Sequence, residues 1–389
     1  MLIGKDKSIC IVTTMSSSID NWIKPFLPEY IKIGVNVTIV SNMTDEYVAD
    51  IRKYPDLKAF PIDFPRGNSL FKSIKCIYKL TKFLKVNRFD MIQFSTPNAS
   101  FYSSIASYMT KIPVRLYCQW GMIYVSQNGI KRHLYKQIEK LICRLSTFVQ
   151  PDSIANLNYC RQEKLYTESK SSVIWNGSAK GVDLTLYDLT KKAMYKNELK
   201  ERYGFSENTV VIGFVGRLGA EKGCNELFRA IQKLENKYPN IILLFVGPIE
   251  KKKSIEPSLL KYFEESTNII GTGRVSDVEK HYAVMDVFVL PSYREGFGMS
   301  VVEAEAMAIP VIVTEYPGPI SGMIPNETGL VIPVKNVSEL VKAIEILIND
   351  ENKRKEFGAR GRAYVEKSFD RHLYTQKYID NRKTLLNID

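Results

Sequence analysis

The fold class of this 389-residue chain is indicated by residues 209–249, TVVIGFVGRLGAEKGCNELFRAIQKLENKYPNIILLFVGPI. Two short apolar runs, TVVIGFVGRL and NIILLFVGPI, flank the amphipathic stretch CNELFRAIQKLENKY. Short apolar strands that alternate with longer amphipathic helices are typical of α/β proteins with parallel sheets. We therefore predict strand, helix and strand in succession here.

The same alternation runs through both halves of the chain and predicts two doubly wound, Rossmann-like domains in tandem. Further predicted strands are SICIVTT, VNVTIVS, DMIQFS, VRLYCQW and STFVQPD in the first half, and TNIIGTGRV, DVFVLPS, PVIVTEY and GLVIPV in the second. We place an N-terminal domain at residues 1–185 and a C-terminal domain at 186–368. The tail, 369–389, is predicted as a helix that packs back on the N-terminal domain.

The composition excludes several classes of protein. With 45% hydrophobic and 25% charged residues, the chain can form substantial cores, so it is not a disordered protein. The six cysteines lie far apart without a C-x-x-C pair, and there are three histidines, so we expect neither a disulfide framework nor a metal centre. No stretch suits a signal peptide or a membrane span. We expect a soluble, cytoplasmic protein.

Basic residues are concentrated in the first half. The net charge is +12, and residues 67–150 hold thirteen Lys or Arg against two acids. On a predicted helix, one face carries Lys72, Lys75, Lys79 and Lys82, and the face predicted to pack on the sheet carries Leu70, Ile74, Ile77, Tyr78 and Leu84. A second basic stripe is formed by Lys131, Arg132, Lys136, Lys140 and Arg144. These stripes favour an anionic membrane surface as partner, and two solvated helix faces are the alternative.

A first candidate site lies in IGFVGRLGAEKG, residues 212–223. Gly216 and Gly219 let the backbone turn after a strand, and Arg217 and Lys222 follow the turn. Backbone amides, a helix start and two cations together suit a diphosphate. The spacing is neither G-x-G-x-x-G nor a P-loop, so a structural turn with two surface cations is the alternative.

A second candidate site lies in PSYREGFGMSVVEAEAMAIPVIVTE, residues 291–315. Glycines at 296 and 298 open a helix just after Glu295, and the first helical amides, near Met299 and Ser300, point at a ligand. Glu303 lies further along this helix, where its carboxylate suits a vicinal diol. The alternative is that both acids are solvated residues near a helix start.

Several motifs, in order, closely resemble the donor domain of family 4 glycosyltransferases of the GT-B fold: GFVGRLGAEKG, LLFVGP, GTGRVSD, DVFVLPSYREGFGMSVVEAEAMAIPVIVTE and NETGLVIP. The resemblance is strong over 210–364 and weaker before, where VIWNGSAKGVDLTLY is similar to the family's N-G-V-D segment. It implies two Rossmann-like domains facing a central cleft. GSAKGVD and LYCQWGMIYVSQNGIKR look most like bacterial members that build lipid-linked surface glycans, such as capsule or O-antigen.

The resemblance also implies roles for individual residues. Arg217 and Lys222 match the pair that neutralises the donor diphosphate, Glu303 the acid that holds the ribose, and Glu295 the acid that orients the sugar. The remaining expected substrate contacts are Gly216, Arg274, Val275, Gly296, Phe297, Gly298, Met299, Ser300, Ser16, Ser17 and Gln119. Arg274 and Val275 match the base-binding stretch, and Ser16 and Ser17 stand where many members have glycines. Gln119 stands where many members carry a histidine, so only hydrogen bonding is open to it; strand-end packing is its alternative.

Members of this family retain anomeric configuration, which implies transfer without a protein nucleophile, the leaving phosphate taking the acceptor proton. Because the chain has no D-x-D, we expect no metal cofactor. The expected donor is a UDP-sugar and the expected acceptor is lipid-linked or a glycan, at the inner face of the membrane. The alternatives are a UDP-sugar epimerase or hydrolase of similar fold, and a polyanion-binding protein. Since no nucleic-acid-binding module is recognisable, nucleic acid is not expected as a partner.

Overall fold

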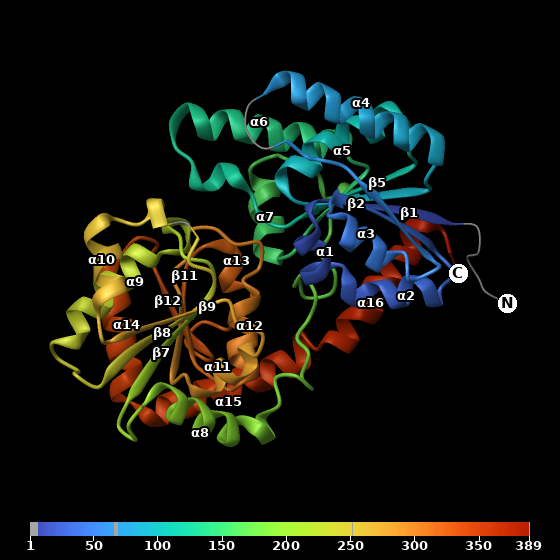
Figure 1. Ribbon diagram of the computed structural model, residues 1–389. Helices are drawn as coiled ribbons and strands as arrows, with labels where there is room; N and C mark the ends of the chain where they lie inside the picture. Colours follow the sequence, from blue (N-terminus) through green and yellow to red (C-terminus); the bar gives the residue numbers. More distant parts are fainter. Residues whose placement is uncertain (1–6, 66–68, 251, 389) are drawn as a thin grey trace. The chain divides into compact units, whose positions relative to one another are not determined.

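The computed structural model describes residues 7–65, 69–250 and 252–388 (Figure 1). The chain divides into two compact units: unit 1 comprises Met1–Lys180 with Leu373–Asp389, and unit 2 comprises Gly181–His372. The predicted domain boundary at residue 185 falls shortly after this division. No helix among the described residues is long and apolar enough to cross a membrane.

Unit 1 contains a six-stranded parallel sheet in the order β3-β2-β1-β4-β5-β6. Its strands are β1 (Ser8–Met15), β2 (Asn36–Asn42), β3 (Leu57–Pro61), β4 (Met91–Phe94), β5 (Val114–Gln119) and β6 (Phe148–Pro151). The inner strands read as continuous apolar runs because helices cover both faces of the sheet.

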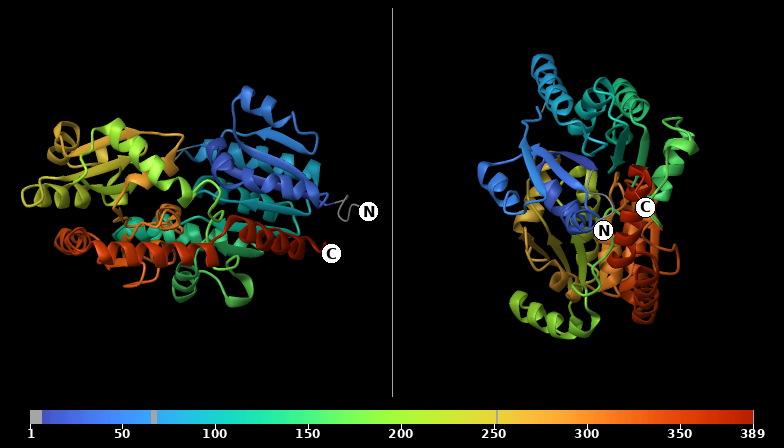
Figure 2. Two further views of the ribbon diagram at one scale, coloured as in Figure 1. Left: turned by 90° about the horizontal axis from the view of Figure 1, so that it is seen from below. Right: turned by 90° about the vertical axis from the view of Figure 1, so that its right-hand side faces the viewer.

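Two helical layers enclose this sheet (Figures 1 and 2). The helices are α1 (Ser16–Trp22), α2 (Leu27–Lys32), α3 (Asp45–Ile51), α4 (Leu70–Asn87), α5 (Pro97–Met109), α6 (Gly129–Leu145), α7 (Ile154–Gln162) and α16 (Arg371–Leu386), with short 3-10 helices at Lys24–Phe26, Ile123–Ser126 and Glu168–Lys170. One core cluster joins α4, α5 and α6 to the sheet through Leu80, Tyr102 and Ile142. The other joins α1, α2 and α16, where Phe26 stacks on Tyr378 at 3.9 Å.

Helix α4 differs from the prediction in the face that it buries. Its inner face is centred on Leu80 and Leu84, as the pattern predicted for Leu84 and, in part, for Ile77. Leu70, Ile74 and Tyr78, by contrast, are exposed, so the prediction that they pack on the sheet is wrong. The sequence carries apolar residues on two sides of this helix, and only one side can face the sheet. Tyr78 precedes Leu80 by two residues, about 200° around a helix, which places it nearly opposite.

Unit 2 contains a second six-stranded parallel sheet, in the order β12-β11-β10-β7-β8-β9. Its strands are β7 (Val210–Val215), β8 (Ile241–Val246), β9 (Ile269–Gly273), β10 (Val287–Leu290), β11 (Val311–Thr314) and β12 (Gly329–Ile332). Its helices are α8 (Lys192–Tyr203), α9 (Cys224–Glu235), α10 (Pro257–Glu265), α11 (Val278–Val284), α12 (Met299–Ala306), α13 (Pro317–Ile320), α14 (Val337–Asn349) and α15 (Glu351–Ser368), with 3-10 helices at Leu189–Lys191, Ala220–Lys222 and Lys252–Ser254. The prediction of two doubly wound α/β sheets is confirmed.

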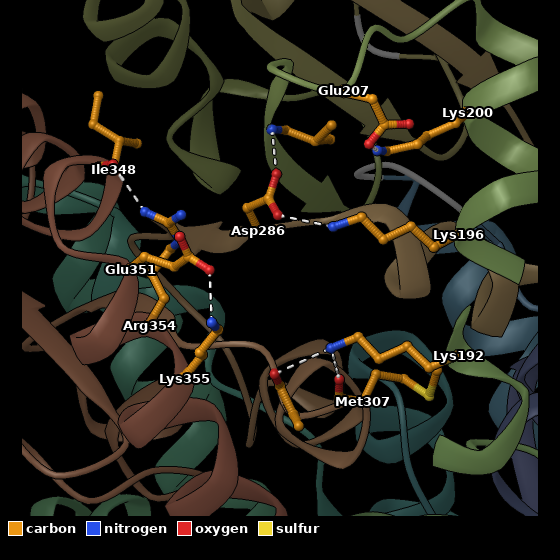
Figure 3. Close-up of polar contacts among 12 residues, drawn as sticks. Lys192, Lys196, Lys200, Glu207, Asp286, Met307, Ile348, Glu351, Arg354 and Lys355 are labelled. Carbon is orange, nitrogen blue, oxygen red and sulfur yellow. Dashed lines mark hydrogen bonds and ion pairs between the residues drawn. The ribbon is translucent and has the colours of Figure 1, made fainter. Parts of the chain in front are cut away.

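Helix α8 lies in a polar stretch that precedes the first strand of unit 2. Lysines at every fourth position hold it against the rest of unit 2 (Figure 3). Lys192 donates to the carbonyl oxygens of Met307 and Ala308, at 2.5 and 3.2 Å. It thus supplies a hydrogen-bond donor to carbonyl groups just after the end of α12. Lys196 lies 3.2 Å from the Asp286 carboxylate, at the start of β10. These contacts anchor α8 to the rest of unit 2.

Candidate functional site

The candidate site of unit 2 lies where the strand order reverses. Strands β7 and β10 are neighbours, but the chain runs from β7 outward through β8 and β9 before it returns to β10. The carboxyl ends of such a strand pair mark the topological switch point, where ligands bind in doubly wound sheets. The two connections that leave this point, β7 to α9 and β10 to α12, carry both motifs singled out in the sequence.

Glycines allow the two connections to approach each other closely. Gly223 has φ +72° at the start of α9, and a Cβ there would lie 2.1 Å from the carbonyl oxygen of Pro291. Gly247 has φ +141°, and a Cβ there would lie 2.1 Å from the carbonyl oxygen of Gly216. The sequence analysis attributed the tight turn to Gly216 and Gly219, whereas Gly223 and Gly247 are the positions where a side chain cannot fit. Their pairing partners are distant in sequence, so spacing alone did not reveal them.

The two cations of the first motif have different surroundings. Lys222 lies with its Nζ 2.5 Å from Oε1 of Glu295, and both side chains are largely buried. Ser292 donates to the same Glu295 oxygen at 2.8 Å. Arg217 is more exposed, with its guanidinium 3.7 Å from the Glu221 carboxylate. The structure thus brings Lys222 and Glu295 together directly, from opposite connections.

The start of α12 is built around Gly298, which has φ +91° and immediately precedes the helix. Phe297 is buried against Phe369 at a centroid distance of 5.2 Å, so its ring anchors the connection. The contribution of Phe297 to a ligand site is therefore its backbone. Met299 is also buried, while Ser300 is partly exposed at the helix start. The amides of the first helical turn lack partners within the helix and suit an anion or hydroxyl acceptor.

Glu303 is partly buried and held by a tyrosine. Tyr282, on α11, donates to Oε2 of Glu303 at 3.2 Å. Burial raises the pKa of Tyr282 and of Tyr187, and the nearby Glu303 carboxylate raises both further. Both tyrosines therefore stay neutral and able to donate. The sequence analysis missed Tyr282, because its position on another helix gives no signal near Glu303.

Arg274 and Val275 follow β9 at the edge of the sheet. They line a surface depression of about 460 Å³ together with Tyr203, Thr272 and Asp277. Arg202 also lines it, and its guanidinium lies 3.7 Å from the Asp277 carboxylate. Arg217, Lys222 and Glu295 are not among its lining residues.

In unit 1, Ser16 and Ser17 are the first residues of α1, directly after β1. Ser17 is exposed and Ser16 partly buried. They therefore lie at the carboxyl end of a strand, as the sequence suggested.

Gln119 is placed in the interior of unit 1. It is 1% exposed, and its amide donates to Oε1 of Glu139 at 2.6 Å while its oxygen accepts from Tyr166 at 3.1 Å. Tyr117 donates to the same Glu139 oxygen at 2.8 Å, and burial raises the pKa of this acid. We therefore no longer expect Gln119 to contact substrate: its polar groups are used within the core, as in the packing alternative. The roles expected for the residues of unit 2 stay predictions.

Within the described residues, no group of three or more His, Cys, Asp or Glu side chains is arranged to hold a metal ion. All six cysteines are buried and unpaired.

Solved structures define the class of the fold. Over 98% of this chain and 99% of the other, the structure is similar to sucrose-phosphate synthase from Thermosynechococcus elongatus, with a TM-score of 0.79 at 18% identity. The fold is GT-B. Residues 195–364 match the family described as Glycosyl transferases group 1. The resemblance noted from the motifs is thus confirmed.

Two bacterial relatives match most of the chain. The capsular polysaccharide biosynthesis glycosyltransferase CapM of Staphylococcus aureus is 29% identical over 356 residues, 91% of each chain. An Escherichia coli enzyme described as UDP-Gal:alpha-D-GlcNAc-diphosphoundecaprenol alpha-1,3-galactosyltransferase is 25% identical over 74% of this chain and 73% of its own.

Proposed function

We propose that this chain is a retaining family 4 glycosyltransferase that moves a hexose from a UDP-sugar to a lipid-linked or glycan acceptor in the synthesis of a surface polysaccharide, of capsule or O-antigen type. The observation that carries the proposal is the meeting of Lys222 and Glu295 at the switch point of unit 2, beside the start of α12. The names of the two bacterial relatives support the choice of pathway, donor and acceptor.

The donor's leaving group is the UDP diphosphate. Arg217 and Lys222 bind it, and the amides at the start of α12 add hydrogen-bond donors. As the bond between the anomeric carbon and the phosphate oxygen breaks, negative charge grows on that oxygen. Fixed donors aimed at growing charge lower the barrier more than they stabilise the ground state. Lys222 is the better placed of the two cations, because its ammonium is already held within the site by Glu295.

The two acids have separate tasks. The Glu303 carboxylate accepts hydrogen bonds from the ribose hydroxyls while Tyr282 holds one of its oxygens. Glu295 accepts from hydroxyls of the transferred sugar. The main chain at Arg274 and Val275 receives the uracil, beside the depression that these residues line. Gly216, Gly296 and Gly298 let the backbone approach the donor without side chains in the way.

Transfer then proceeds on one face of the sugar. The acceptor oxygen bonds to the anomeric carbon on the side that the diphosphate leaves, and the departing electron pair stays on the β-phosphate oxygen. That oxygen takes the acceptor's proton, so no protein base is required. Configuration is retained, and no protein carboxylate becomes attached to the sugar, as it would in a retaining glycosidase. We include no metal ion in this mechanism, so the rate should survive EDTA.

The proposed site of action is the inner face of the cell membrane, where a lipid-linked acceptor lies. Lys72, Lys75, Lys79 and Lys82 are all exposed on α4, as a contact with anionic headgroups requires. Lysines near an anionic surface contribute about 1 kcal/mol each, so four would hold the chain reversibly.

Nucleotide release tests the function. UDP-, GDP- and ADP-hexoses should be offered with and without a polyprenyl-diphosphate-linked sugar. We expect UDP release that depends on the acceptor, and an α-linked product from an α-linked donor by NMR. Equal release without acceptor would instead identify a hydrolase, and a donor converted to its epimer would identify an epimerase. Release from GDP-sugars alone would overturn the proposed donor.

A further inference from the structure

Helix α4 exposes large apolar side chains among its lysines. Leu70, Phe71, Ile74 and Tyr78 are between 58% and 78% exposed. They occupy the first half of the helix, on the side away from the buried Leu80. Single exposed apolar residues are common on proteins, but a contiguous group of this size marks an interaction surface.

Helix α6 repeats the arrangement. Ile130, Leu134 and Leu141 share one side of the helix, at i, i+4 and i+11, and are 89%, 57% and 38% exposed. The opposite side is the one that packs on the sheet, through Ile142 and Cys143. The apolar stripe of α6 therefore faces away from the core of unit 1.

The two stripes lie on one layer of unit 1. Helices α4, α5 and α6 cover the same face of the sheet, with α5 in contact with both of its neighbours (Figure 1). Ser73 of α4 and Tyr102 of α5 are joined by a hydrogen bond of 3.1 Å, which fixes the two helices together. We call the exposed apolar residues of α4 and α6 the apolar platform: Leu70, Phe71, Ile74, Tyr78, Ile130, Leu134 and Leu141.

The charge around the apolar platform is positive and uncompensated. Helix α4 carries five lysines and no acid, and the one acid of α6, Glu139, is buried. Lys75 and Lys82 share the outward side of α4 with Phe71 and Tyr78. On α6 the exposed cations are Lys131, Lys140 and Arg144.

Two members of the predicted basic stripe on α6 have a different task. Arg132 and Lys136 pair with Glu163 at the end of α7, at 3.6 and 2.5 Å. They hold α6 to its neighbour and do not contribute free charge to the outward side.

The mixture of apolar side chains and lysines on this surface indicates which kind of partner can bind it. A second copy of this chain would place one lysine-rich face against another, with like charges in contact, which is unfavourable. A bilayer with anionic headgroups meets both properties at once: its acyl boundary accepts the apolar groups, and its headgroups accept the ammonium ends of lysines whose stems lie along the surface. This combination is typical of helices that lie in a membrane interface.

We infer that the apolar platform enters the interfacial region of an anionic bilayer, and that the lysines of α4 and the free cations of α6 contact its headgroups. The inference rests on the proposed function only in that a lipid-linked acceptor gives such docking a purpose. Charge alone gives reversible attachment that salt removes, whereas inserted side chains make it persist. The structure thus assigns two contributions to binding, one that salt weakens and one that resists salt.

Vesicle co-sedimentation of the full chain tests this inference without donor or acceptor. Vesicles of phosphatidylcholine, with or without phosphatidylglycerol, are compared as salt rises from about 0.1 M to about 1 M, which shortens the screening length from about 10 Å to about 3 Å. We expect the wild type to need phosphatidylglycerol for tight binding and to keep a measurable part of it at high salt.

Three variants separate the contributions. Replacing Phe71, Ile74, Ile130 and Leu134 by Ser should weaken binding at least tenfold and remove the salt-resistant part, by the loss of inserted apolar groups. Replacing Lys72, Lys75, Lys79 and Lys82 by Gln should reduce the preference for phosphatidylglycerol. A matched control replaces Met194 and Ile346 by Ser, which are similarly exposed in unit 2, and should bind like the wild type.

Two outcomes would overturn the inference. One is unchanged binding of the four-serine variant, which would leave electrostatic attachment alone. The other is a wild type that ignores anionic vesicles but sediments as a dimer that the four-serine variant dissociates, which would make a second copy the partner. Phe71→Trp gives a second readout: its emission should shift to the blue and be quenched by brominated lipids. Transfer to a short, water-soluble acceptor should survive in the four-serine variant, so loss of docking and loss of function are distinguishable.

Discussion

Lys222 and Glu295 form an ion pair of 2.5 Å between the two connections that leave the switch point of unit 2. They are separated by 73 positions in the chain. The pair keeps a cation and a carboxylate in place before a donor arrives, so that less reorganisation is needed when the diphosphate binds. It also gives Lys222 a closer and less exposed partner than Arg217 has, since the Arg217 guanidinium stands 3.7 Å from the Glu221 carboxylate.

This difference predicts unequal effects on stability and similar effects on rate. Lys222→Ala and Arg217→Ala should each lower kcat about 100-fold or more, as losing one preorganised donor does. Lys222→Ala should also lower the free energy of unfolding by about 1–3 kcal/mol, because the largely buried Glu295 loses its cationic partner. Arg217→Ala should lower the free energy of unfolding by less than about 1 kcal/mol, because exposed ion pairs contribute little to stability. Steady-state kinetics and urea unfolding measure the two effects, and near-normal transfer in both variants would exclude the assigned diphosphate position.

Glu303 and Tyr282 should act together on the nucleotide. Glu303→Ala removes the proposed ribose acceptor and should weaken UDP binding at least tenfold. Tyr282→Phe removes the hydroxyl that holds Glu303. It should weaken UDP binding about fivefold, which is the effect of one hydrogen bond of about 1 kcal/mol. Calorimetric titration of UDP gives both values. Glu356→Ala, on the exposed side of α15, is the control. An unchanged UDP dissociation constant in the Glu303 variant would remove the ribose assignment.

Glu305, two residues after Glu303, should make stability depend on pH. It is fully buried, and burial raises its pKa well above the ordinary value. A raised carboxyl pKa means that the folded state holds the proton more tightly than the unfolded chain does. The stability that protonated Glu305 contributes is therefore full below about pH 4.3 and is lost as the pH rises. Glu305→Gln imitates the protonated acid and should raise Tm most at pH 8 and least at pH 5. A constant Tm difference across this range would contradict the explanation.

Lys192 should make the stability of the protein depend on pH in the alkaline range. Burial lowers its pKa to about 8 (Figure 3 shows its two carbonyl partners). The unfolded chain, with a lysine pKa of about 10.4, then binds more protons than the folded one, so stability should rise with pH from about 8 to about 10. Lys192→Met should flatten this rise in thermal scans. Lys355→Met, at an exposed pair on α15, should leave the slope as in the wild type.

Much of the fold could be predicted because each strand of the two sheets is a short apolar run bounded by helical periodicity. The donor motifs also stand where the sequence placed them, at the ends of β7 and β10. Sequence position could not reveal which side chains pair with one another. The order of the strands in the sheet, not the spacing along the chain, brings Lys222 to Glu295 and Tyr282 to Glu303. These pairs required the three-dimensional structure.

Two predictions in unit 1 failed for related physical reasons. Gln119 ends a strand, where polar residues often face ligands, but Glu139 and Tyr166 from distant elements take up its amide. In α4, apolar residues occupy two sides of the helix, and periodicity does not say which side meets the sheet. In each case the outcome depends on neighbours that packing supplies and local sequence does not.

The backbone contact between Gly223 and Pro291 has a consequence for how donor preference changes. There the two connections that are proposed to bind the phosphates meet main chain against main chain, at a point where no side chain fits. Side chains proposed to lie near the sugar but outside that contact, such as Ser300, can therefore be exchanged without disturbing it. A library restricted to positions 294 and 300 should yield enzymes with altered hexose choice and undiminished affinity for UDP, whereas a single methyl group at position 223 should abolish UDP binding.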